Sequence, residues 1–172
     1  PAVDTDGDGL RDFLDLDGDG DGLFDVVEGE SGCADTTPRN GRCDGADGDR
    51  DGVVNSIDGQ NGWGTAAYPV APDSDGDGTP DYRELDSDND GLFDRAEGNA
   101  GCADSAPPPG RCDGPDADGD GAADDAAATV PDTDGDGQPD YQDLDADGDG
   151  LRDAVEGERD TDGDGHPDFR DL

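Results

Sequence analysis

Apolar residues occur singly along most of this chain, with aspartate and glycine between them. In the stretch DTDGDGLRDFLDLDGDGDGLFDVVEG, which begins at Asp4, an acidic side chain stands at nearly every second position. No segment keeps the apolar repeat of about 3.6 residues that an amphipathic helix needs. The pattern therefore predicts an irregular fold with little regular secondary structure, and at most single helical turns, as at 25–28 and 94–97.

The same text returns along the chain. Close copies begin at Asp73 and Asp132, and the motif restarts once more at Asp160. Linkers rich in Gly, Ala and Pro separate the copies, and the third copy lacks a cysteine segment that the first two share. Self-similarity of this kind indicates a repeat architecture. The predicted modules are residues 1–68, 69–130 and 131–172.

Composition rules out an ordinary hydrophobic core. Hydrophobic residues make up 28% of the chain, and 50 acidic residues against 10 basic ones give a formal net charge of -40. Such a composition is typical of disorder unless something other than a core holds the chain. The charge also argues against nucleic acid as a partner, because phosphate binding needs clustered Arg and Lys. No apolar run reaches the roughly 18 residues needed for membrane insertion.

The four cysteines form two pairs with the same spacing. Cys33 and Cys43 lie in GCADTTPRNGRCDG, and Cys102 and Cys112 lie in GCADSAPPPGRCDG. Zinc is the rival interpretation, but zinc sites usually show closer cysteine spacing or histidine partners. We therefore expect local disulfides, Cys33–Cys43 and Cys102–Cys112, which place the protein outside the cytosol.

The alternating acids match a known pattern of metal ligands. Ca2+ takes 6–8 oxygen ligands, and the twelve-residue EF-hand loop supplies them from positions 1, 3, 5, 7 (a backbone carbonyl), 9 and 12, with glycine at position 6. Residues 4–15 satisfy this template throughout. The predicted ligands there are Asp4, Asp6, Asp8, Leu10, Asp12 and Asp15.

The template fits nine stretches, each named here by its first and last residue. After loop 4–15 they are loops 17–28, 47–58, 73–84, 86–97, 116–127, 132–143, 145–156 and 160–171. Their predicted ligands are, in that order, Asp17, Asp19, Asp21, Leu23, Asp25, Glu28; Asp47, Asp49, Asp51, Val53, Asn55, Asp58; Asp73, Asp75, Asp77, Thr79, Asp81, Glu84; Asp86, Asp88, Asp90, Leu92, Asp94, Glu97; Asp116, Asp118, Asp120, Ala122, Asp124; Asp132, Asp134, Asp136, Gln138, Asp140, Asp143; Asp145, Asp147, Asp149, Leu151, Asp153, Glu156; and Asp160, Asp162, Asp164, His166, Asp168, Asp171. Loop 116–127 has Ala127 at position 12, so we expect the weakest site there unless Asp125 or a linker carbonyl substitutes.

Calcium accounts for the charge better than the alternatives do. An acidic halophile surface or a disordered tail would explain the aspartates, but not a glycine at position 6 in nine registers. Mg2+ is disfavoured because it demands octahedral geometry and rarely uses all-protein cages. About nine Ca2+ ions would bring the formal net charge from -40 to -22, which removes much of the repulsion.

The loops do not form ordinary EF-hands. The paired loops of each copy begin 13 residues apart, at Asp4 and Asp17, Asp73 and Asp86, and Asp132 and Asp145, and the loop at Asp160 begins 15 residues after Asp145, so no flanking helices fit between them. The motif DxDGDGxxDxxDxDxDGDGxxDxxE, as in 132–156, resembles the bacterial version of thrombospondin type 3 repeats. The resemblance implies Ca2+ ions wrapped in series by the Asp and Glu residues assigned above. The cysteine segment departs from the animal repeats, so their disulfide topology is not carried over.

The sparse apolar residues recur at fixed places in the loops. Aromatic residues stand at position 10 and leucines one residue after position 12, and we expect them to pack as small clusters against a neighbouring loop. These residues are Phe13, Tyr82, Tyr141 and Phe169, followed by Leu16, Leu85, Leu144 and Leu172.

The sequence shows no catalytic constellation, so we do not expect an enzyme. It predicts an elongated, calcium-stapled tandem-repeat rod or solenoid, secreted or on the cell surface, that serves as a stalk, an adhesin spacer or a filament subunit. The expected partners are calcium ions and copies of the chain itself in a longer array. Because the chain starts at Pro1 rather than Met, we expect a processed product or a piece of something longer. Two alternatives stay open: a dockerin-like module that binds a partner protein, and a disordered acidic calcium store or mineral matrix protein.

Overall fold

The computed structural model describes residues 3–29, 35–36, 41–46 and 71–171. Within these ranges the regular structure consists of single helical turns, and there is no strand, which confirms the prediction of little regular secondary structure. The turns are α1 (Asp25–Glu28), η1 (Asp81–Arg83), α3 (Asp94–Glu97), η2 (Asp140–Gln142), α4 (Asp153–Glu156) and η3 (Asp168–Arg170), where η marks a 3-10 turn.

Each turn occupies the same place in its loop, starting at position 9. The three η turns follow a proline at position 8 in extended conformation, as Pro80 does with φ -76° and ψ 148°. The three α turns run from position 9 to position 12 and stop at the next residue, which is glycine, as Gly98 is after α3. A proline or an extended residue before the turn and a glycine after it keep the helix from growing.

One backbone hydrogen bond closes every loop that the structure describes. The N–H at position 9 donates to the carbonyl of the residue just before position 1, as from Asp25 to Leu16 (2.9 Å) and from Asp94 to Leu85 (3.0 Å). The same bond recurs at Asp12, Asp81, Asp124, Asp140, Asp153 and Asp168. Local bonds of this kind form within twelve residues, so each loop can take its shape without a sheet or a long helix.

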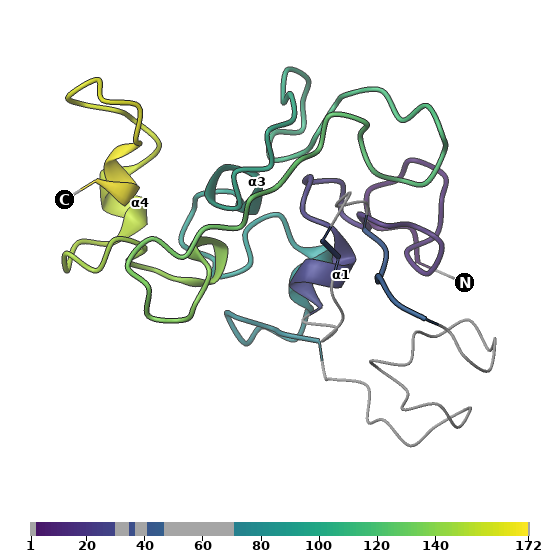
Figure 1. Cartoon of the computed structure of the whole chain (residues 1–172), viewed down its shortest axis with the longest axis horizontal. Coiled ribbons are helices and arrows are strands. Elements are labelled where there is room, and N and C mark those ends of the chain that lie inside the picture. Colours follow the sequence, from purple (N-terminus) through teal and green to yellow (C-terminus); the bar gives the residue numbers. More distant parts are fainter. Residues whose placement is uncertain (1–2, 30–34, 37–40, 47–70, 172) are drawn as a thin grey trace.

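Helical turns of successive copies of the motif pack against each other. Turn α1 contacts η1, α3 contacts η2, and α4 contacts η3. The N-terminal and C-terminal segments lie at opposite ends of the long axis of the molecule (Figure 1). Helical turns that are far apart in sequence therefore meet between one copy of the motif and the next.

A side-chain ladder repeats this link from copy to copy. The residue at position 11 of one loop contacts the position-9 carboxylate of the corresponding loop in the preceding copy, through an ion pair or a hydrogen bond. Arg83 Nε lies 3.0 Å from Asp12 Oδ2, and Gln142 Nε2 lies 2.9 Å from Asp81 Oδ2. Arg170 makes the third link, with Nε 2.6 Å from Oδ2 of the buried Asp140.

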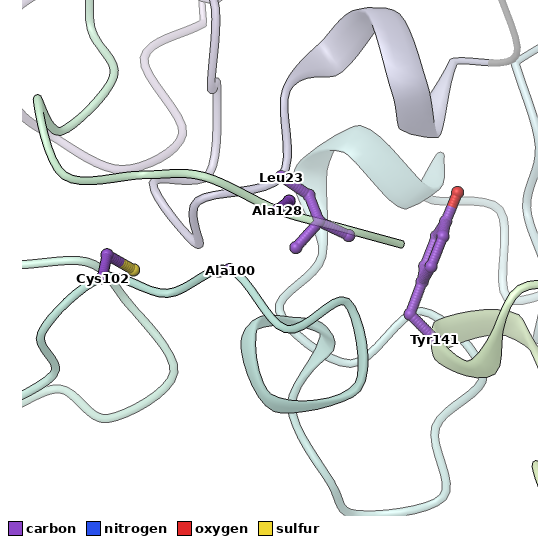
Figure 2. Close-up of a cluster of buried hydrophobic side chains, with 5 residues drawn as sticks. All are labelled: Leu23, Ala100, Cys102, Ala128 and Tyr141. Carbon is purple, nitrogen blue, oxygen red and sulfur yellow. The ribbon is translucent and has the colours of Figure 1, made fainter. Parts of the chain in front are cut away.

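Two small apolar clusters lie between the copies. Figure 2 shows the first, in which Leu23 and Tyr141 meet three small residues of the second module. The small residues are Ala100, Cys102 and Ala128. The second cluster consists of Leu92, Ala146 and Phe169. The clusters are far too small to be the core of an ordinary domain.

The aromatic residues at position 10 differ in burial. Tyr141 and Phe169 are each 1% exposed, as expected, and Tyr82 is partly buried, but Phe13 is 73% exposed. Phe13 belongs to the first copy, and the surface that covers Phe169 comes from an earlier copy. The packing prediction is therefore confirmed for the later copies and wrong for Phe13.

A disulfide joins Cys102 to Cys112, with 5.5 Å between their Cα atoms, which confirms the predicted local pair. Cys43 is also disulfide-bonded, and Cys33 lies outside the described residues. The Cys102–Cys112 hairpin packs on the first module, where Cys112 N–H donates to the Gly20 carbonyl (2.7 Å).

Candidate metal sites

Each acidic loop in the described ranges is wrapped by hydrogen bonds from its own backbone to its carboxylates. In loop 17–28 the position-1 carboxylate of Asp17 accepts N–H bonds from Gly20 and Gly22, both 3.0 Å long. Asp19 accepts from the N–H of Asp21 (3.2 Å), and Asp21 accepts from the N–H of Leu23 (2.7 Å). These bonds turn three alternate carboxylates toward one point.

Position 6 requires a residue that tolerates positive φ. Gly22 has φ +95° and Gly78 has φ +102°, a region that L-residues with side chains rarely enter. The wrap of the acidic loops therefore depends on glycine there.

Carboxylate oxygens converge in many of these loops. Within each group the ligand atoms lie within 4.8 Å of one another, close enough to hold one metal ion. The groups include Asp73, Asp75, Asp77, Glu84; Asp4, Asp6, Asp8; Asp17, Asp19, Asp21; Asp21, Glu28, Asp94; and Asp86, Asp88, Asp90.

The position-12 carboxylates face the same points. Burial raises the pKa of Glu84 to about 7, and the charges of Asp77 and Asp75 raise it further. Burial and the charges of Asp88 and Asp90 raise the pKa of Glu97 to about 10. The same causes raise the pKa of Glu156, Asp143 and Asp171, where the nearby charges are again those of positions 3 and 5 of the same loop. Positions 3, 5 and 12 thus share one electrostatic site.

Buried oxygens without hydrogen-bond partners test whether a cation fits. A buried carboxylate oxygen costs free energy unless it is hydrogen-bonded, paired or coordinated. Among the described residues, several such oxygens accept no hydrogen bond, and all of them belong to positions 3, 5 or 12. They are Asp19 Oδ2, Asp21 Oδ2, Glu28 Oε1 and Oε2, Glu84 Oε2, Asp88 Oδ2, Asp90 Oδ2, Glu97 Oε1 and Oε2, Asp147 Oδ2 and Glu156 Oε2. Oxygens alone, several per loop and strongly negative, fit a hard divalent cation such as Ca2+.

The position-9 carboxylates have a second role that sequence reasoning missed. They accept hydrogen bonds from position 2, from the backbone N–H and, where position 2 is Ser or Thr, from the hydroxyl as well. Asp94 accepts from Ser87 N (2.8 Å) and Ser87 Oγ (2.5 Å), and Asp81 accepts from Ser74 N and Oγ (both 2.8 Å). The available signal was the Ser or Thr that follows the first aspartate in five of the loops.

The predicted ligands not yet described are those at position 7, those of loop 116–127 and those of loop 47–58. At position 7 the backbone N–H donates to the position-5 carboxylate, as from His166 to Asp164 (2.9 Å). In loop 116–127, Ala127 N–H pairs with the Ala100 carbonyl (2.7 Å), and the Asp125 carboxylate lies against Gly114. Loop 47–58, with all its predicted ligands, lies outside the described residues.

Comparison with known proteins adds no assignment, because neither a family model nor a curated protein matches this chain. Across the part of the chain that the structure describes, no helix has the length and apolar character to span a membrane. The evidence on function therefore comes from the loops themselves.

Proposed function

We propose that the chain is a secreted, structural calcium-binding repeat protein, whose ions stiffen it into an elongated rod or solenoid. It would serve as an extracellular stalk, an adhesin spacer or a filament subunit. The observation that carries this proposal is the set of buried carboxylate oxygens at positions 3, 5 and 12, which accept no hydrogen bonds among the described residues. The resemblance of the sequence motif in 132–156 to bacterial thrombospondin type 3 repeats supports the same conclusion.

Calcium would take the place of a hydrophobic core. Because a metal site of this kind does not exist in the unfolded chain, the free energy of binding becomes free energy of folding. Extracellular calcium modules typically bind with Kd of about 10⁻⁴–10⁻³ M, which suits millimolar external calcium. The Cys102–Cys112 disulfide supports an oxidising compartment, since such bonds are rare in the cytosol.

Calcium titration and chelation test the proposal. We expect isothermal titration to show about nine bound Ca2+ ions, and Mg2+ at equal concentration to bind far more weakly. Small-angle scattering should show an elongated, ordered particle with calcium and an expanded, disordered chain after EDTA. A particle of unchanged dimensions after EDTA, or no calcium uptake at millimolar concentration, would refute the proposal.

The same measurements separate the rod from the two alternatives. A disordered calcium store would stay protease-sensitive when calcium is added, whereas the rod becomes protected. A dockerin-like module would gain helix on calcium binding in far-UV circular dichroism. The rod gains protection with little change in helix content, because its turns are only three or four residues long.

A further inference from the structure

Loop 17–28 is the most deeply buried of the acidic loops that the structure describes. Asp19, Asp21 and Glu28 are each 0% exposed, and Asp17 is 1% exposed. In loop 132–143, by contrast, Asp132, Asp134 and Asp136 are exposed. A single loop of twelve residues cannot hide its own carboxylates in this way, so the burial comes from elsewhere in the chain.

The second module supplies the cover. Cys112 Sγ lies 3.1 Å from the Asp21 carbonyl oxygen. A Cβ added to Gly22 would stand 2.4 Å from the same sulfur and 2.9 Å from Ala100 Cβ. Gly98 is packed as closely against the Leu23 side chain. The second module therefore closes over loop 17–28 and leaves no room for a side chain at Gly22.

The second module also brings a charge. Asp94, at position 9 of loop 86–97, is 0% exposed, and its carboxylate lies within 4.8 Å of those of Asp21 and Glu28. Figure 1 shows α1 and α3, which carry Glu28 and Asp94, in the central part of the molecule. Three buried acidic side chains, Asp21, Glu28 and Asp94, thus meet where two modules join.

These carboxylates need a cation. Both oxygens of Glu28 and one oxygen each of Asp19 and Asp21 accept no hydrogen bond among the described residues. Burial raises the pKa of Glu28 well above its ordinary value, and the charges of Asp19, Asp21 and Asp94 raise it further. Isolated buried charge of this kind persists only when it is paired or coordinates a metal.

We propose that the Ca2+ of loop 17–28 is held jointly by two modules, with Asp94 as a ligand supplied by the second. Binding of this ion and packing of the second module on the first then occur together. The ion cross-links the two modules, and the second module, packed over loop 17–28, slows its release. The Ser87 bonds hold Asp94 in place, and each of its oxygens keeps a lone pair for the ion. This inference rests on the proposed function, because it takes calcium as the ion, but it reassigns Asp94 from its own loop to another.

A second position-9 aspartate is buried at the next junction. Asp153, at position 9 of loop 145–156, is 0% exposed, and its charge acts on Asp88 and Glu97 of loop 86–97 in the preceding module.

Counting bound ions in paired backgrounds tests the inference. The probe is Ca2+ alone, on the full chain, with ions counted by native mass spectrometry over a calcium series. Asp94→Asn should raise the Kd of one ion by about tenfold or more, since one charged ligand is lost. In a background with loop 17–28 disabled by Asp21→Asn and Glu28→Gln, Asp94→Asn should cost no further ion. In a background with loop 86–97 disabled by Asp88→Asn and Asp90→Asn, Asp94→Asn should still cost one.

The control is Asp81→Asn, because Asp81 is equally buried and has the same bonds from a serine. It should leave the ion of loop 17–28 in place. If Asp94→Asn prevents folding, Ser87→Ala keeps the charge and loosens only its support, and it should weaken the same ion about twofold to fivefold; Ser74→Ala should not. The inference is wrong if Asp94→Asn still costs an ion when loop 17–28 is disabled but costs none when loop 86–97 is disabled. It is also wrong if Ser87→Ala leaves the ion of loop 17–28 unaffected. Either result would leave calcium binding by the chain intact. Absence of bound calcium in the unaltered chain would instead refute the proposed function.

Discussion

Phe169 and Phe13 occupy the same position in equivalent loops but have opposite surroundings. Phe169 is 1% exposed, packs with Leu92 and Ala146, and lies under the Arg170 guanidinium at 4.7 Å from the ring centroid. Truncating a buried Phe to Ala costs about 3–5 kcal/mol, and the lost cation–π contact adds about 0.5–2 kcal/mol. We therefore expect Phe169→Ala to lower the local free energy of unfolding by at least about 3 kcal/mol, the low end of the Phe→Ala range.

Hydrogen exchange at saturating calcium measures this effect locally. A loss of about 3 kcal/mol lowers amide protection in peptides that cover η2, α4 and η3 by roughly 100-fold, since about 1.4 kcal/mol corresponds to a factor of ten. Phe13→Ala is the matched control, because Phe13 is 73% exposed and surface truncations stay within about 0.5 kcal/mol. Equal effects of the two substitutions, or unchanged protection in Phe169→Ala, would show that the apolar clusters do not hold the copies together.

Three further predictions concern charge and packing. Burial and the charges of Asp88 and Asp90 raise the pKa of Glu97 to about 10, so Ca2+ binding at loop 86–97 must displace a proton. Calcium affinity measured by titration should therefore fall as the pH is lowered from 10, and the stability of the calcium-bound chain to urea should fall in the same direction. Gly22→Ala should lower the thermal midpoint far more than Gly78→Ala. Both glycines have positive φ, but a Cβ at Gly22 would collide with Cys112 and Ala100, whereas a Cβ at Gly78 would have no atom within 4 Å. Arg170→Ala should cost about 3 kcal/mol in urea unfolding, because it leaves a buried charge unpaired, whereas Arg42→Ala, from an ion pair with a 61% exposed arginine, should cost less than about 0.5 kcal/mol.

The local structure could be predicted from the sequence because it is set within twelve residues. Alternate aspartates accept the backbone N–H groups two residues ahead, and glycine at position 6 takes the positive φ that the wrap requires. The single turns at 25–28 and 94–97 were also predictable, since the apolar pattern is too short for a longer helix. The Cys102–Cys112 pair followed from a spacing that occurs twice in the chain.

The contacts between copies could not be predicted in the same way. The EF-hand template assigns Asp94 to loop 86–97, because the template considers only spacing along the sequence and no contacts between loops. The meeting of Asp94 with Glu28 depends on how two modules pack, and nothing in loop 86–97 alone encodes it. The exposure of Phe13 has the same cause, since the repeat pattern treats all copies as equal although their neighbours differ.

The difference between copies explains how such an acidic chain can hold a defined shape. Each described loop closes on itself with one backbone hydrogen bond, but that bond leaves its carboxylates open to water, as in loop 132–143. Closure by a following module buries the carboxylates, as in loop 17–28, and burial makes an ion there both more necessary and harder to release. An ion held in this way resists screening by salt, since buried charges are screened much less than exposed ones. Stiffness of the proposed rod would therefore reside in the junctions between modules, and exposed loops would contribute mainly by neutralising charge.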